Sequence, residues 1–186
     1  MALPKTIFDA DGNVKDYEKS FPLLLAHAKE RDPIAQSLVG YCYLKGLGVR
    51  KNRLEARRWL RDAASQGDVD AMSNLGLMLE IGDGSSTNRR QALHWYGKAA
   101  ENGSSFAQVN LGLMYLSGRR ANHTLGLHWL RKAARKHDAR AMLNLGIAYL
   151  RGDGVAKSPK SAERYFKRAA ELGDEDAKVY LSQHGR

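Results

Sequence analysis

The stretch Ala141-Met-Leu-Asn-Leu-Gly-Ile-Ala-Tyr149, followed by Leu150-Arg-Gly-Asp-Gly-Val155, decides the fold because the chain repeats its pattern. The copies of its central glycine are Gly40, Gly76, Gly112 and Gly146, at spacings of 36, 36 and 34 residues. An aromatic residue follows each glycine after 17 or 19 residues; these are Trp59, Trp95, Trp129 and Tyr165. A period of this length predicts an α-helical solenoid of stacked helix pairs.

Residues 68–103 show how one repeat is built. The apolar stripe of its first helix consists of Ala71, Leu75 and Leu79. Asp68 stands where its side chain caps this helix, and Gly82 stands where the helix ends. Asn88 begins the second helix, with Gln91 three residues on, as in a capping box. The sequence therefore predicts a helix–turn–helix unit.

The glycine inside each first helix indicates a close helix crossing. Glycine there costs about 1 kcal/mol relative to alanine. Because four copies accept this cost, we expect the second helix to cross at the glycine, where a side chain would hold it away. We also expect the tryptophan position and the alanines after it to line the buried side of the second helix.

The repeats divide the chain into segments. We expect an N-terminal segment at residues 1–18, a leading helix at 19–31, four repeats and a C-terminal capping helix at 174–186. The repeats are residues 32–67, 68–103, 104–137 and 138–173. Pro22 leaves the start of the leading helix open, and His137 stands where the other repeats end in glycine.

Composition indicates the kind of partner and the compartment. The net charge is +10, and residues 104–137 hold six basic and no acidic residues. Such a chain attracts acidic partners, including phosphates. Cys42 is the only cysteine and is expected to be a half-buried structural residue. With no long apolar run and no leader-like start, we expect a cytoplasmic protein.

The sequence carries no pattern typical of an enzyme. No serine or cysteine has a recognisable base partner. The six histidines do not show the spacing of metal ligands. We therefore expect no catalytic site, no metal site and no cofactor.

The full pattern resembles a known family. Ala-x-x-x-Leu-Gly-x-x-Tyr-x-x-Gly-x-Gly-Val, then Ala-x-x-Trp-x-x-x-Ala-Ala-x-x-Gly, is similar to the Sel-1-like repeat, a subclass of the tetratricopeptide-type repeats. The resemblance covers about residues 19–184. It implies an all-α, right-handed α/α solenoid of about four full helix–turn–helix repeats plus terminal half-repeats. It also implies adaptor or scaffold work without catalysis, often in bacterial signalling or host interaction.

The resemblance implies that first helices line a concave face, where a partner binds. Helical spacing selects two rows of candidates there: Asn74, Asn110 and Asn144, and Tyr41, Leu77, Leu113 and Ile147. An asparagine ladder beside an apolar row holds an extended peptide without reading its sequence. The alternative is that the asparagines satisfy nearby backbone groups and the apolar row is packing between repeats.

A second set of candidates is basic. It consists of Arg57, Arg58, Arg61, Arg119, Arg120, Arg131, Lys132 and Arg135, on second helices and turns that face outward. Nucleic-acid binders interleave such charge with exposed aromatic residues. Because the tryptophans are expected in the core, nucleic-acid binding would depend on charge alone.

The leading hypothesis is a non-enzymatic adaptor that binds an acidic peptide or protein on its concave face. A second hypothesis is binding of nucleic acid or an anionic surface through the outward basic residues. A third is a specific inhibitor, such as an immunity protein for an effector, which would use the same concave face.

Overall fold

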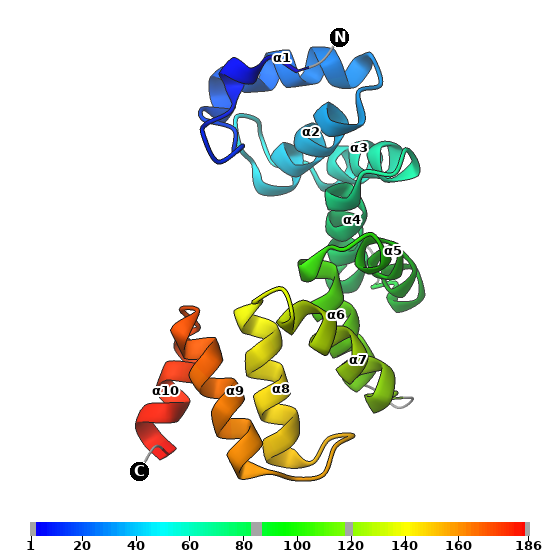
Figure 1. The fold of residues 1–186 in the computed structure, drawn as a ribbon. Helices are drawn as coiled ribbons and strands as arrows, with labels where there is room; N and C mark the ends of the chain where they lie inside the picture. The colour runs from blue at the N-terminus through cyan, green and yellow to red at the C-terminus, as the bar shows by residue number, and fades with distance from the viewer. Residues whose placement is uncertain (1–2, 83–86, 118–120, 185–186) are drawn as a thin grey trace. The chain divides into compact units, whose positions relative to one another are not determined.

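The computed structural model describes residues 3–82, 87–117 and 121–184, which form ten α-helices and one 3₁₀-helix (Figure 1). The only strand-like pairing within these residues is an isolated bridge between Phe8 and Val14. The chain divides into two compact units, Met1–Asn102 and Gly103–Arg186. The predicted class, an all-α solenoid of about four helix pairs with terminal half-repeats, is confirmed.

Unit 1 holds the leading helix and two helix pairs. Its α-helices are α1 (Tyr17–Lys29), α2 (Pro33–Lys45), α3 (Arg53–Ser65), α4 (Val69–Ile81) and α5 (Arg89–Glu101), after a 3₁₀-helix η1 (Lys5–Ile7). Each α-helix packs against the next one along the chain, and α2 also contacts α4. The first helices α2 and α4 are thus neighbours.

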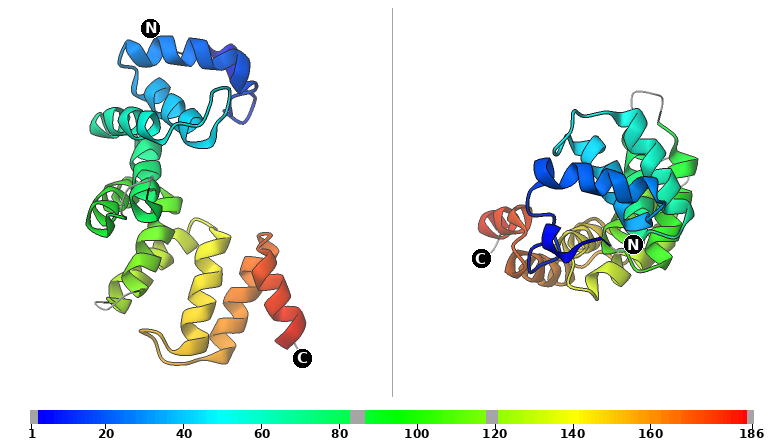
Figure 2. Two further views of the ribbon diagram at one scale, coloured as in Figure 1. Left: turned by 180° about the vertical axis from the view of Figure 1, so that it is seen from behind. Right: turned by 90° about the horizontal axis from the view of Figure 1, so that it is seen from above.

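Unit 2 holds two helix pairs and the trailing helix. Its helices are α6 (Ser105–Leu116), α7 (His123–Ala134), α8 (Ala139–Arg151), α9 (Pro159–Glu171) and α10 (Glu175–His184). Each contacts the next, and Figure 2 shows α8, α9 and α10 side by side. The trailing helix covers α9 through the ring of Tyr180, whose centre lies 4.1 Å from that of Phe166.

The helices begin where the sequence predicts. Asp68 accepts a hydrogen bond from the amide of Ala71 at 2.7 Å, and the residue at the same position caps each of the other first helices. Asn88 accepts from the amide of Gln91 at 3.0 Å, which is one half of the predicted capping box, whereas the amide of Asn88 donates to the carbonyl of Leu79 at 2.8 Å. Four equivalent caps on four first helices explain why the repeat boundaries are legible in the sequence.

The four repeat glycines mark the helix crossings, as predicted. A Cβ atom built on Gly76 would lie 2.7 Å from Cδ1 of Tyr96, and one on Gly146 would lie 2.6 Å from Cε1 of Phe166. In the other two repeats the side chain that meets the glycine is a leucine, Leu60 at Gly40 and Leu130 at Gly112. Each second helix therefore approaches too closely for any side chain but hydrogen.

The tryptophan position lies at the edge of the core rather than at its centre. Trp129 is buried at 9% exposure, whereas Trp59, Trp95 and Tyr165 are half-buried. The fully buried residue is the next one along the chain, such as Tyr96 at 0% exposure. One residue turns the helix by 100°, so the next residue faces the crossing glycine. The aromatic position is left at the edge of the core.

The leading helix starts earlier than predicted. It begins at Tyr17 rather than at residue 19, because Asp16 caps it by accepting from the amide of Lys19 at 3.1 Å. Pro22 lies inside this helix and is exposed. Glu18, whose carbonyl loses its helical partner because proline has no N–H, is also an exposed residue, which limits the disruption.

Cys42 is fully buried in α2, rather than half-buried as expected. Burial raises the pKa of its thiol to about 11, so little thiolate exists at pH 8. We expect Ellman's reagent to leave the native protein unmodified at pH 8 and to react fully in urea. The absorbance of the released dye measures both. Fast reaction of the native protein would contradict the burial of this side chain.

His137 ends the third repeat in a left-handed conformation, with φ of 61°, where the other repeats have glycine. A side chain in this region costs about 1–2 kcal/mol. We expect His137→Gly to raise the free energy of unfolding by about 1 kcal/mol, measured by urea denaturation. The matched change Gly173→Ala, at the equivalent position with φ of 92°, should lower it by a similar amount. Destabilisation by His137→Gly would contradict this account.

Candidate interaction surfaces

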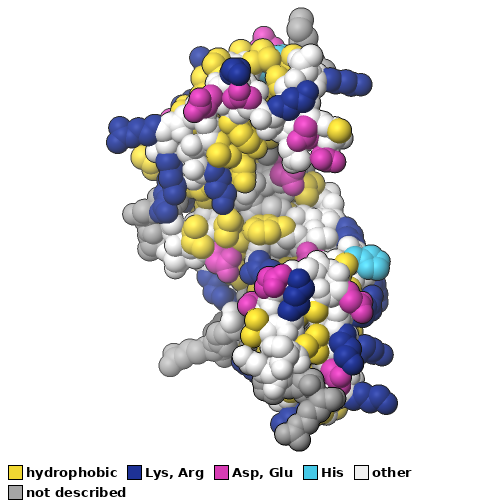
Figure 3. All heavy atoms as spheres, turned by 90° about the vertical axis from the view of Figure 1, so that its left-hand side faces the viewer, with side chains coloured by type: hydrophobic (Ala, Val, Ile, Leu, Met, Phe, Trp, Pro, Cys, Tyr) yellow, Lys and Arg dark blue, Asp and Glu magenta, His cyan; other side chains and the backbone are white. Residues whose placement is uncertain are grey.

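One face of each unit is formed by the first helices and is here called the first-helix face. In unit 1 it consists of Ile34, Leu38, Tyr41 and Lys45 from α2 and Asp70, Asn74, Leu77 and Ile81 from α4, at helical spacings of three and four. Ile34 and Ile81 are 56% and 58% exposed. Figure 3 shows hydrophobic side chains gathered on the side of unit 1 that faces the viewer. The core leaves this stripe partly open.

The first-helix face of unit 2 is apolar and basic. It consists of Phe106, Asn110, Leu113 and Ser117 from α6 and Arg140, Asn144, Ile147 and Arg151 from α8. Phe106 is 42% exposed, while Leu113 and Ile147 pack partly against the core. Both arginines are exposed, and this stripe contains no acidic residue. The named residues of this stripe therefore carry a net positive charge.

The predicted asparagine row lies on this face, but its members have different partners. Asn144 donates from Nδ2 to the carbonyl of Arg140 at 2.7 Å, within its own helix. Asn110 is 6% exposed, and its Oδ1 accepts from Arg140 Nη1 at 3.2 Å. Asn74 is half-buried, and its amide bonds no described residue. The alternative that the asparagines satisfy nearby backbone groups therefore describes Asn144 and does not describe Asn74.

The predicted apolar row also lies on the first-helix face. Tyr41, Leu77, Leu113 and Ile147 are all half-buried. Lys45 Nζ lies 5.9 Å from the ring centre of Tyr41, which adds a cation–π contact at this end of α2. Each of these side chains is therefore partly covered by the protein and partly exposed on this face.

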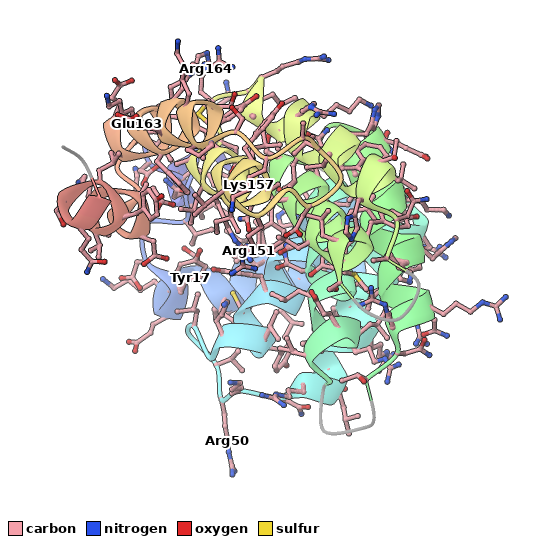
Figure 4. All side chains as sticks on the ribbon, turned by 90° about the horizontal axis from the view of Figure 1, so that it is seen from below. Tyr17, Arg50, Arg151, Lys157, Glu163 and Arg164 are labelled. Carbon is pink, nitrogen blue, oxygen red and sulfur yellow. The ribbon has the colours of Figure 1, made fainter. Side chains whose placement is uncertain are left out.

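The predicted basic residues lie on or beside the second helices and line separate grooves instead of forming one patch. Arg57 and Arg61 line a groove with Trp95, Arg58 lines another with Trp59, and Arg131 and Arg135 line a third with Tyr165. Lys132 lies over the ring of Trp129 at 4.6 Å. Arg119 and Arg120 lie outside the described residues. Figure 4 shows Arg50 extending away from the loop after α2 and Arg164 pointing outward from α9.

Sequence reasoning missed residues on the first-helix face and in the grooves of the second helices. Ile34 and Phe106 share one position of the first helix, four residues before the asparagine row, and this spacing was visible in the sequence. Arg168 lines the groove beside Tyr165, three residues further along α9. Its role depends on the half-exposure of Tyr165, which the pattern did not reveal.

These repeats and surfaces define an α/α solenoid repeat protein. The Sel1 repeat family matches residues 33–68, 69–104, 105–138 and 139–174, most of the chain. The protein therefore belongs to the Sel1 repeat family. The Sel1 repeat is a helical scaffold typical of protein–protein interaction and is not typically enzymatic.

Solved structures with the same fold come from bacteria. A Sel1 repeat protein from Oxalobacter formigenes is 40% identical with a TM-score of 0.81, over 90% of this chain and 67% of that one. The protective antigen c5321 of uropathogenic Escherichia coli is 38% identical with a TM-score of 0.85, over 92% of this chain and 37% of that one. This chain thus spans little more than a third of the antigen.

A more distant structure is the immunity protein Pa5087 from Pseudomonas aeruginosa. It is 20% identical with a TM-score of 0.62, over 91% of this chain and 64% of that one, and shows the shared fold alone. No curated protein matches the sequence.

Among the residues that the structure describes, no helix is both long and apolar enough to cross a membrane. In the same residues, no three His, Cys, Asp or Glu side chains converge in a way that could hold a metal ion.

Proposed function

We propose that the protein is an adaptor whose first-helix face binds a peptide or a segment of a partner protein. The observation that carries this proposal is the apolar stripe on the first helices. Of the seven large hydrophobic side chains exposed among the described residues, three lie on this face: Ile34, Ile81 and Phe106. Exposed apolar side chains beside a half-buried row provide burial energy to a partner.

The charge of the face favours an acidic partner. In unit 2, Arg140 and Arg151 flank Leu113 and Ile147, with no acidic residue in the stripe. The net charge of +10 also draws acidic molecules to the protein over a longer range. In unit 1 the amide of Asn74, which bonds no described residue, offers a donor and an acceptor to a peptide backbone. The single buried thiol, Cys42, suits work in the cytoplasm.

The two other hypotheses draw less support. The basic residues of the second helices line separate grooves, and their aromatic neighbours are covered by basic side chains. This arrangement supports nucleic-acid binding less well than a continuous basic surface with open rings. An inhibitor or immunity role would use the first-helix face too, and the fold of Pa5087 alone supports it. The identity of the partner separates an inhibitor from an adaptor.

The proposal is tested with a random peptide library displayed on phage, selected on the full chain and on an unrelated basic protein. Peptides enriched only on this protein are synthesised and their affinities measured by calorimetry. We expect them to combine acidic and apolar residues. We expect Ile34→Asp to weaken the peptides that bind unit 1 at least about tenfold, because it places a charge against an apolar contact.

The matched control is Leu54→Asp. Leu54 is also an exposed apolar side chain, at 75%, and it occupies the second position of α3 as Ile34 does in α2. Leu54 lies outside the first-helix face. The Leu54→Asp variant should therefore bind each peptide with the affinity of the unchanged protein. Phe106→Asp serves the same purpose as Ile34→Asp for unit 2. Equal affinity of all variants for every enriched peptide would refute the proposal.

A further inference from the structure

A groove on the second helices of unit 2 combines three arginines with an apolar floor. It has a volume of about 260 Å³ and lies between α7 and α9 over α8. Its lining residues are Arg131 and Ala134 from α7, Arg135 directly after that helix, Leu145 from α8, and Tyr165 and Arg168 from α9. The lining contains no carboxylate, so its field attracts anions.

The three guanidinium groups have no acidic partner within the described part of unit 2. The ion pairs there join Lys167 to Glu163 and Lys178 to Glu175. Arg131 and the C-cap residue Arg135 are four residues apart at the end of α7, and Arg168 belongs to the opposite wall. Each guanidinium presents donors in a planar fork that matches a carboxylate. The groove therefore has several donors ready for oxyanions.

The floor and one wall of the groove are apolar. Leu145 is fully buried beneath it, and Ala134 is 9% exposed. Tyr165 is half-buried and its ring stacks on that of Tyr149, with centres 5.6 Å apart. An anion with a short apolar stem fits these surroundings better than a fully hydrated ion.

Unit 1 contains an equivalent groove, also of about 260 Å³. Arg61 and Arg131 occupy the same repeat position, two residues after the aromatic one, and Trp95 takes the place of Tyr165. Its floor is formed by Leu75 and Leu79 of α4. One arginine, the leucine floor and the aromatic wall therefore recur in both units. Ser65 and Lys98 stand in unit 1 where unit 2 has Arg135 and Arg168, so the cluster of three arginines is specific to unit 2.

The aromatic rings are not available for stacking with bases. The guanidinium carbon of Arg164 lies 5.7 Å from the ring centre of Tyr165, which also stacks on Tyr149. Lys98 Nζ lies 5.2 Å from the ring centre of Trp95, and the ring of His94 meets that tryptophan edge-on. Single-stranded nucleic acid needs open ring faces. A carboxylate needs only the arginine donors.

We propose that the groove between α7 and α9 binds glutamate or aspartate side chains of an acidic peptide segment. The carboxylates bond Arg131, Arg135 and Arg168, and the apolar part of the segment lies over Leu145 beside Tyr165. This site is separate from the first-helix face and does not depend on the function proposed for that face.

The test uses a short fluorescent peptide rich in glutamate with interspersed leucine, and measures anisotropy with the full chain. We expect Arg131→Glu/Arg135→Glu to weaken binding at least about tenfold more than the control Lys157→Glu/Lys160→Glu. The control makes the same change of charge in unit 2 at exposed lysines outside the groove. Circular dichroism should show unchanged helicity in both variants.

Three outcomes would overturn the proposal. Equal losses in the two double variants would mean that the peptide responds to net charge alone. Loss of peptide binding by Phe106→Asp, together with full binding by Arg131→Glu/Arg135→Glu, would place the peptide on the first-helix face. Tighter binding of a single-stranded oligonucleotide that requires Arg131 and Arg135 would assign the groove to nucleic acid. Retained binding by Phe106→Asp with loss in the groove variant supports this site even if the first-helix face binds nothing.

Discussion

Gly76→Ala is expected to lower the free energy of unfolding by about 1–3 kcal/mol. The new Cβ would lie 2.7 Å from Cδ1 and 3.0 Å from Cγ of Tyr96, near the root of that side chain. Tyr96 is fully buried, and its hydroxyl donates to Glu80 at 2.9 Å, so the ring has no room to withdraw. This overpacking outweighs the gain of about 1 kcal/mol that alanine brings to a helix interior.

The same substitution at Gly97 serves as the control. Gly97 also lies inside a helix, α5, but a Cβ built on it would meet no heavy atom within 4 Å apart from its chain neighbours and the backbone of its own helix. Gly97→Ala should therefore raise the free energy of unfolding by about 1 kcal/mol. Urea denaturation followed by circular dichroism measures both changes. If both alanines stabilise the protein, the repeat glycines do not mark tight helix crossings.

This pair of glycines also shows what the sequence alone can predict. The repeated position of Gly76 indicated a tight crossing, and the structure has one. The partner at that crossing was not predicted, because Trp95 and Tyr96 are adjacent and both suit a core. Only the phase of the second helix decides between them. A periodic pattern fixes the spacing of an apolar stripe more firmly than the residue at its centre.

The interaction surfaces were predictable to a smaller degree. The rows of Asn74 and Leu77 follow from helical spacing, and the structure places both on the first-helix face. The partners of the asparagines differ because Arg140, which only the fourth repeat has at this position, reaches Asn110. The outer grooves depend on the half-exposure of Tyr165. Local differences between repeats, invisible to the shared pattern, therefore decide which side chains remain available.

Phe166→Ala is expected to lower the free energy of unfolding by about 3–5 kcal/mol. The ring is 1% exposed, meets Gly146 at the crossing of α8 and α9, and lies against Tyr180 of α10. Its loss would leave a cavity that no neighbour can fill, since Gly146 has no side chain. The trailing helix would lose its contact with the same ring. Urea denaturation measures the change.

The neighbouring Tyr165→Ala is the matched comparison, because it removes an aromatic ring one residue earlier in the same helix. Tyr165 is half-buried at the edge of the core and stacks on Tyr149, a pair worth about 1 kcal/mol beyond its buried area. We expect it to cost less than half as much as Phe166→Ala. If Tyr165→Ala lowered the free energy of unfolding more than Phe166→Ala, the aromatic repeat position would belong to the centre of the core. It would also remove the basis for an open groove beside Arg131 and Arg168, because the groove requires that ring to form an outer wall.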